Sequence, residues 1–328
     1  MAKNTEQRQV INKIDLVGEV AEQKLNKDKN KNGSYINGSL VIKTGEFSEI
    51  EIKVFAGEKN KDGKPKKAFE TLKKFIDGEH LTLASCKTDE ERESVAKVRI
   101  YTTNKDFTPQ FKEDIFKPKG TEEVKTKLTV DLGFGNVSVD NSIKAENYKA
   151  EFEVELFVTS VKEEMKQDEA TGRVIVNGWT PLYGGKVMPM EVIAGTIIDD
   201  EGEEYDFGDD ILSQVEEGMT INVWGEINYK TIITKTTKGG GLGKAKVEEH
   251  RDYVNDLIMV GATIQEDEEQ ELDMELIKKA IIERDIEIEN VRKEEGSDTK
   301  KSKGKGMDKG SSTSSTSGER PKRERPKF

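Results

Sequence analysis

Two segments of the chain share one order: an amphipathic helical stretch, then a glycine, then a strand of alternating polarity. In the first segment the apolar and glycine positions are Phe69, Leu72, Phe75, Ile76, Gly78, Leu81 and Leu83. In the second they are Leu212, Val215, Gly218, Ile221 and Val223. Helical spacing of the apolar residues indicates a half-buried helix, and a following glycine suits the left-handed residue that ends one. The pattern therefore predicts a helix followed directly by a strand in residues 68–84 and again in residues 211–225.

Three strand-like runs precede each predicted helix. In the first half they are Val10–Val20, Tyr35–Lys43 and Phe47–Phe55, and in the second half they are Phe152–Val158, Arg173–Trp179 and Val187–Ile193. Three strands, a short helix and further strands is the order of a five-stranded Greek-key barrel, the OB-fold. We therefore predict a mainly β protein with two OB-fold-like five-stranded Greek-key barrels, a C-terminal helix and a disordered tail.

The remaining segments complete this division of the chain. Val98–Tyr101 and Leu128–Val139 are strand-like, and the polar stretch Asn104–Thr121 between them is interpreted as a loop. Ile227–Thr237 and Glu249–Thr263 have the pattern of a long hairpin, and Asp273–Arg292 that of a helix. The predicted domains are residues 1–145 and 146–265 for the barrels, 266–295 for the helix and 296–328 for a basic Ser/Gly/Lys-rich tail.

The net charge of −12 is unevenly distributed along the 328 residues. Residues 1–150 carry 28 Lys/Arg and 25 Asp/Glu, residues 151–300 carry 16 and 37, and residues 301–328 carry 9 and 3. The first barrel and the tail are therefore better suited to a polyanion than the acidic middle. The single Cys86, the polar N-terminus and the absence of a long apolar run indicate a cytoplasmic protein without a membrane segment.

Signals of catalysis are weak. The two histidines, His80 and His250, fall in different predicted domains without the spacing of a zinc site. The glycine-rich stretch near Gly243 lacks the first glycine and the final Ser/Thr of a phosphate-binding loop. We expect a non-enzymatic protein with no cofactor and no metal.

Residues suited to nucleic acid gather in the first unit. Lysines fill the predicted loop between strands one and two, and the loop after strand three: Lys24, Lys27, Lys29, Lys31, Lys59, Lys61, Lys64, Lys66 and Lys67. Such loops border the face of an OB barrel that receives a single strand. Tyr35 and Phe47 lie on or beside these strands and could stack on bases. The alternative is that Tyr35, Phe47 and Phe55 belong to the barrel core, and for Phe55 we favour that interpretation.

The second unit offers a smaller set. Trp179, Tyr183 and Lys186 lie near the turn between its second and third strands, where we expect the two aromatic rings to face solvent. The long hairpin carries a group of basic residues within an acidic domain: Lys230, Lys235, Lys238 and Lys244. Trp224 is interpreted either as core or as a stacking surface.

The segment Ala68–Gly78 and the strand predicted after it resemble the helix-to-strand passage of bacterial and phage single-stranded DNA-binding proteins, and the two copies resemble tandem-OB proteins of the replication protein A type. The resemblance implies a sequence-tolerant single-stranded DNA-binding protein in replication or recombination, with replication or recombination proteins as partners of the tail. The high Lys, Glu and Asn content and the lack of an enzymatic motif suit a phage-encoded protein, which would act in the host cytoplasm. The bacterial family ends in an acidic tail, whereas this chain ends in a basic one of which only Phe328 fits. The alternative is a phage structural or assembly protein that uses its OB-like domains for protein interaction.

Overall fold

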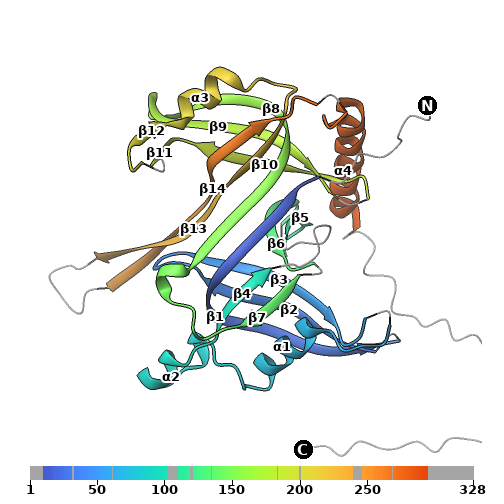
Figure 1. Cartoon of the computed structure of the whole chain (residues 1–328), viewed down its shortest axis with the longest axis vertical. Coiled ribbons are helices and arrows are strands. Elements are labelled where there is room, and N and C mark those ends of the chain that lie inside the picture. Colours follow the sequence, from blue (N-terminus) through green and yellow to red (C-terminus); the bar gives the residue numbers. More distant parts are fainter. Residues whose placement is uncertain are drawn as a thin grey trace, which may run out of the picture.

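The computed structural model of the chain is mainly β and is built from one large mixed sheet with few helices (Figure 1). It describes residues 10–31, 33–60, 62–101, 110–118, 121–133, 135–182, 184–198, 201–238, 246–267 and 269–294. For residues 230–238 and 246–253 only the backbone is described. None of the helices among these residues combines the length and the apolar character that crossing a lipid bilayer requires.

The first barrel is a closed sheet with the five-strand order of an OB-fold, in which two short strands share the fifth place. Its elements are β1 (Asn12–Asn30), β2 (Gly33–Lys43), β3 (Glu49–Gly57), α1 (Lys67–Ile76), β4 (Lys97–Tyr101), β6 (Lys125–Asp131) and β7 (Asn136–Val139). β1, β2 and β3 form an antiparallel meander, β6 pairs in parallel with β3, and β7 pairs with β4, which returns to β1. Because β6 runs on into β7, the two serve as one fifth strand, and the pairing closes as in an OB-fold.

The first helix ends as predicted, but the strand predicted after it is wrong. Gly78, with φ +76°, follows α1 in the left-handed conformation that terminates a helix. Leu83–Ser85 is a short 3₁₀ helix, η1, rather than a strand, and α2 (Asp89–Glu93) precedes β4. Alternation over three residues was too short to separate a strand from one turn of 3₁₀ helix.

Two predicted loops also contain strands. β1 continues through Asn30, and Lys24 to Lys29 pair with β2, so only Lys31 of that group lies at the turn. The stretch Asn104–Thr121 contains β5 (Gln110–Phe116), which pairs with β6. Both strands are polar on the side that faces solvent. Backbone hydrogen bonds hold them, and because such bonds require no particular side chain, the strands leave no regular apolar spacing in the sequence.

The second barrel repeats the pairing order of the first. Its elements are β8 (Lys149–Lys166), β9 (Glu169–Pro181), β10 (Val187–Ala194), α3 (Phe207–Gln214), β13 (Thr220–Lys238) and β14 (Lys246–Ile264). β8, β9 and β10 form a meander, β14 pairs in parallel with β10, and β13 pairs with both β14 and β8. A small hairpin of β11 (Thr196–Ile198) and β12 (Glu204–Asp206) precedes α3, and η2 (Ala145–Asn147) links the two barrels. Here the predicted passage from helix to strand and the predicted long hairpin are confirmed.

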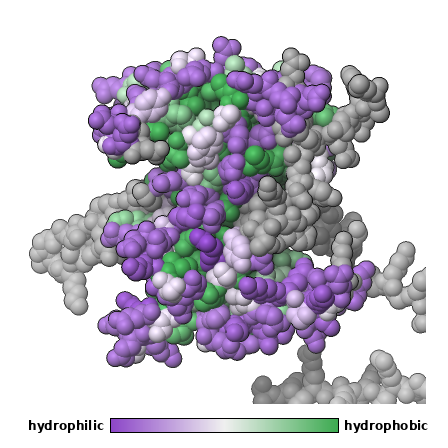
Figure 2. Space-filling model, viewed as in Figure 1, coloured by the Kyte–Doolittle hydropathy of each residue, from purple (hydrophilic) through white to green (hydrophobic). Residues whose placement is uncertain are grey.

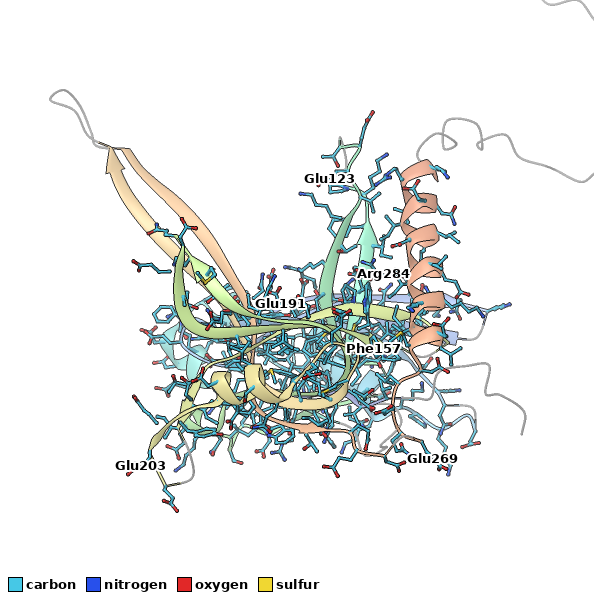
Figure 3. The ribbon with its side chains drawn as sticks, turned by 90° about the horizontal axis from the view of Figure 1, so that it is seen from above. Glu123, Phe157, Glu191, Glu203, Glu269 and Arg284 are labelled. Carbon is cyan, nitrogen blue, oxygen red and sulfur yellow. The ribbon has the colours of Figure 1, made fainter. Side chains whose placement is uncertain are left out.

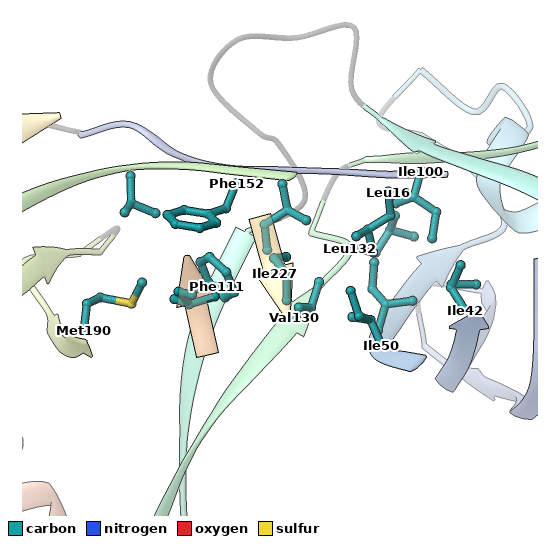
Figure 4. Packing of buried hydrophobic residues seen from close by; sticks show 14 of the residues in the cluster. Leu16, Ile42, Ile50, Ile100, Phe111, Val130, Leu132, Phe152, Met190 and Ile227 are labelled. Atoms are coloured by element: carbon teal, nitrogen blue, oxygen red, sulfur yellow. The ribbon is translucent and has the colours of Figure 1, made fainter. Parts of the chain in front are cut away.

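The barrels are joined strand to strand. Residues 12–17 of β1 pair with residues 149–154 of β8 in antiparallel register, so the first strand of each barrel is shared between them. Across this junction the centroids of the Phe111 and Phe152 rings are 6.1 Å apart. The buried Asn12 amide donates a hydrogen bond to the C=O of Phe111 and accepts one from its N–H. One apolar core therefore runs through both barrels, from Ile42 to Met190 (Figure 4).

The C-terminal helix α4 (Met274–Glu294) confirms the predicted one and packs beside β10 and the β5–β6 hairpin (Figure 1). Leu272, Ile277 and Ala280 are buried against Phe157 and Val187 of the second barrel. The predicted disordered tail from Gly296 lies outside the described residues.

Candidate nucleic-acid interface

An aromatic pair lies on the outer face of strands β2 and β3. The rings of Tyr35 and Phe55 are 5.3 Å apart and tilted by 33°. Along β3, Ile50, Ile52 and Val54 point into the barrel, and Phe55 alternates with them to the outside, where 60% of it is exposed. The interpretation of Phe55 as core is therefore wrong. Its parity with Glu51 and Lys53 was the signal in the sequence that could have placed it.

Phe47 does not join this pair. It lies in the turn between β2 and β3 and is 63% exposed. The β2–β3 ladder runs from Lys43 opposite Glu49 beside that turn to Tyr35 opposite Gly57 at the far end. The structure thus separates the two predicted stacking residues by the length of the hairpin, and Phe55 takes the place beside Tyr35.

Two lysine-rich segments converge at the Tyr35 end of the hairpin. The N–H of Glu58 donates to the C=O of Ser34 at 2.9 Å, and the N–H of Lys66 donates to the C=O of Glu58 at 3.0 Å. These bonds hold the β3–α1 loop against the end of the β1–β2 ribbon. The exposed lysines brought together are Lys27, Lys29, Lys31, Lys59, Lys64 and Lys67. We call these six residues the lysine cluster.

The lysine cluster is electrostatically available. Within the part of the chain that the structure describes, none of the six ammonium groups forms an ion pair, although Lys27 lies over the Phe69 ring at 5.7 Å. Lys24 differs, because its ammonium group donates a hydrogen bond to the Glu22 carboxylate, with an N–O distance of 3.1 Å, and this bond raises the pKa of Lys24. Lys66 is partly buried beside the cluster, and Lys61 lies outside the described residues. Uncompensated surface cations of this density favour a polyanionic ligand.

The faces formed by the second and third strands of both barrels border one cleft of about 1120 Å³. The first barrel contributes Lys24 and Lys53, and the second contributes Asn177 and Glu191. Its charged lining is five carboxylates and three lysines: Glu22, Glu49, Glu51, Glu191, Asp256, Lys24, Lys53 and Lys127. Lys53 is already paired with Asp114 of β5. The charge of this lining is therefore negative on balance and disfavours phosphate, whereas the lysine cluster is positive and attracts it.

One phenol lines this cleft under strong burial. Desolvation raises the pKa of Tyr229, on β13, to about 12, so the group stays neutral at physiological pH.

On the face shown in Figure 2, hydrophilic residues cover most of the outer surface of both barrels.

The second barrel's predicted aromatic site is covered by α4. Trp179 lies on β9 and packs against the cluster that seats the helix, and the Arg284 guanidinium lies over its ring at 5.4 Å. The expectation that Trp179 faces solvent is wrong, because the sequence gives no sign of where a C-terminal helix docks. Lys186 is exposed and forms an ion pair with Glu287 of α4 at 2.8 Å, and Tyr183 lies outside the described residues.

Arg284 also connects the barrels. It donates two hydrogen bonds of 2.6 Å to the Glu113 carboxylate on β5, and the side chains of the pair are only 14% and 8% exposed. The hydrogen bond to Glu113 raises the pKa of Arg284 further. Figure 3 shows α4 beside the β5–β6 hairpin with Arg284 between them. The helix thus occupies part of the strand two–three face of the second barrel and ties it to the first.

The long hairpin of the second barrel projects from the body of the molecule (Figures 1 and 3). Its ladder extends to the pair Lys238 and Lys246. Lys230, Lys235 and Lys238 lie on β13 where only the backbone is described, and Lys244 lies outside the described residues. The structure therefore brings Tyr35 together with six of the predicted lysines of the first barrel. Phe47 lies at the other end of the hairpin, and Trp179 and Lys186 of the second barrel contact α4 instead.

The family model named YorF matches residues 10–294, and this range is most of the chain. The chain belongs to the YorF family. No curated protein matches it. Among solved structures, a deletion mutant of the single-stranded DNA binding protein from Thermus aquaticus is similar over 79% of this chain and 97% of that one, with 8% identity and a TM-score of 0.39. A likeness at that level carries no argument about the function of this YorF-family protein.

Proposed function

We propose that this protein binds single-stranded DNA with little sequence preference, in replication or recombination, through its first barrel. The observation that carries the proposal is the pair of partly exposed Tyr35 and exposed Phe55 at one end of the strand two–three face, beside six lysines that form no ion pair among the described residues. Aromatic rings bind the face of any base, and lysines bind phosphate irrespective of sequence. Lysine–phosphate contacts form on a duplex as well, but stacking needs unpaired bases, so the aromatic pair is what favours a single strand.

The decisive experiment measures binding of a labelled thirty-nucleotide oligo(dT) and of a matched duplex by fluorescence anisotropy at two salt concentrations. The wild type should prefer the single strand and weaken as salt rises. Changing Lys29, Lys31, Lys59 and Lys64 to Gln should weaken binding and flatten the salt dependence, since each phosphate contact contributes about 0.7 to the slope on single strands.

The matched control changes four lysines that lie outside the cluster, Lys87, Lys144, Lys162 and Lys278, to Gln. It lowers the net charge by the same amount, so it should leave affinity close to that of the wild type. Equal affinity for duplex and single strand, or equal losses in the two variants, would contradict the proposal.

A second role fits the second barrel. Its strand two–three face is partly covered by α4, and the cleft it borders is mostly acidic. These features favour protein contact rather than DNA there, as in the alternative of a structural or assembly protein. A chain that fails to bind single strands in the experiment above while remaining folded would favour that alternative for the whole molecule.

A further inference from the structure

The outer side of α4 has no partner among the described residues. The helix packs through Ile277, Ala280, Ile281 and Arg284, which face the second barrel and the β5–β6 hairpin. On the other side Ile282 is 61% exposed and Ile286 is 54% exposed. Two isoleucines one turn apart form a small continuous apolar strip on the exposed side of the helix, where charged residues otherwise predominate.

The strip continues into charges at regular spacing. Glu275, Lys279, Ile282, Ile286, Glu289 and Lys293 succeed one another at steps of four, three, four, three and four residues. Because an α-helix has 3.6 residues per turn, these six positions follow one line along the helix, opposite Arg284. This is the spacing of a seam at which two helices pack. We call these six residues the α4 seam.

The α4 seam is complementary to itself when one copy is turned end for end. Antiparallel alignment about position 284 places Ile282 against Ile286, Lys279 against Glu289 and Glu275 against Lys293 of a second copy. A parallel alignment would instead place each charge against its like. The ion pairs these residues make in the monomer run along their own helix, such as Lys279–Glu283 and Glu289–Lys293, both at 4.0 Å and solvent-exposed. Such pairs are weak and can exchange partners.

We propose that the α4 seam is the contact surface for a second copy of this chain, which binds as an antiparallel helix pair around a two-fold axis. A two-fold contact uses the same patch on both copies, as this seam does. The patch is small, so the dimer is a weak one in free solution. Two copies held on one DNA strand would meet at a high effective concentration, which makes even a weak contact productive.

Sedimentation velocity over a range of concentrations up to about 100 μM tests the contact on the full chain. The wild type should shift from monomer toward dimer, and the double variant Ile282→Glu and Ile286→Glu should raise the dissociation constant at least about tenfold. The control is Ile198→Glu, which changes an isoleucine that is 74% exposed on β11. Circular dichroism shows whether each variant keeps its fold. A wild type that stays monomeric, or a folded double variant that dimerises as well as the control, would overturn the proposal.

Charge exchange tests the alignment. Lys279→Glu alone places two carboxylates together on each side of the central isoleucines, where Lys279 would face Glu289, and should weaken the dimer. Adding Glu289→Lys restores both pairs with reversed sign and should recover most of the affinity. No recovery in the folded double variant contradicts the antiparallel pairing.

Cysteine crosslinking gives an independent reading of the same geometry. In a Cys86→Ser background, protein carrying Ile282→Cys should form a disulfide with protein carrying Ile286→Cys faster than either forms one with itself. Faster self-crosslinking of each variant would indicate a parallel pair and overturn the proposal. Because no DNA is present in these three measurements, their failure leaves the proposed DNA binding untouched.

Discussion

At the scale of single residues, alternation along β3 decides the chemistry of the candidate interface. One step of register separates Val54 in the core from Phe55 in solvent. Because 60% of the Phe55 side chain is exposed, it buries little apolar area in the fold and keeps surface available for a ligand. The neighbouring Tyr35 leaves one face of the Phe55 ring open.

Phe55→Ala should therefore reduce affinity for oligo(dT) by about 1–3 kcal/mol, the free energy of one stacked base. Phe47→Ala is the matched control, because Phe47 is equally exposed but lies at the other end of the hairpin. Fluorescence anisotropy measures both variants. Equal losses from the two would show that exposed aromatic area, rather than the Tyr35–Phe55 site, governs binding.

Trp224 has a structural role that the sequence left open. Its indole lies against Gly261, the residue opposite it on β14, where an added Cβ would collide with the ring carbons. An aromatic ring that covers a cross-strand glycine stabilises the sheet. Gly261→Ala should lower the free energy of unfolding by about 1–3 kcal/mol in urea titrations. Adding Trp224→Ala should remove most of the extra penalty, and strict additivity of the two changes would contradict the contact.

His80 provides a pH-dependent term. Burial, and next the Lys74 ammonium, lower the pKa of its imidazole below 6.5, with Glu79 opposing them. The unfolded chain then binds the proton more readily than the folded one, so stability is lost as pH falls below about 6.5. An NMR titration should place the His80 midpoint below 6.5, and His80→Gln should reduce the fall in stability between pH 7 and pH 5.5. A midpoint above 6.5 would contradict this.

At the scale of elements, the sequence predicts most strands and helices but not how far they extend. Periodicity located β3, β8, β10 and α4, because each has one buried face. It missed β5, in which only Phe111 is fully buried, and the distal half of β1, which is polar, exposed and held mainly by its backbone pairing with β2. For the same reason the lysines predicted in a loop are partly on a strand, although they still reach the predicted neighbourhood.

The docking of α4 could not be predicted, because it depends on a pair of residues 171 positions apart, Glu113 and Arg284. Glu113→Leu leaves a mostly buried guanidinium without its carboxylate and should lower the free energy of unfolding by about 3 kcal/mol. Loss of the helix from Trp179 should also red-shift tryptophan emission in a Trp224→Phe background. Lys186→Ala, which breaks an exposed ion pair with the same helix, should lower stability by less than about 1 kcal/mol. Similar losses of stability in the two variants would contradict the conclusion that the buried Glu113–Arg284 pair holds the helix in place.

At the scale of the whole molecule, the two barrels share strands and core rather than meeting at a soft interface. β1 belongs to the ladders of β2, β4 and β8 at once. Two-domain chains often unfold in steps, but a continuous apolar core opposes this because opening either barrel exposes the other's buried face. The sequence predicted two similar units and contained no signal of this junction, because Phe152 resembles ordinary barrel core and Phe111 lies in a stretch interpreted as a loop.

We therefore expect one cooperative unfolding transition. Both tryptophans, Trp179 and Trp224, lie in the second barrel, and the single cysteine, Cys86, lies in the first. Tryptophan emission and pulsed labelling of Cys86 thus follow the two barrels separately in one urea titration of the unmodified chain. Their midpoints should coincide. Phe152→Ala, which removes a junction ring that is 3% exposed, should lower both midpoints together by an amount equivalent to about 3–5 kcal/mol. Separate midpoints in the wild type, or a shift of the tryptophan signal alone in the variant, would show that the barrels fold independently and that the shared strand does not couple them.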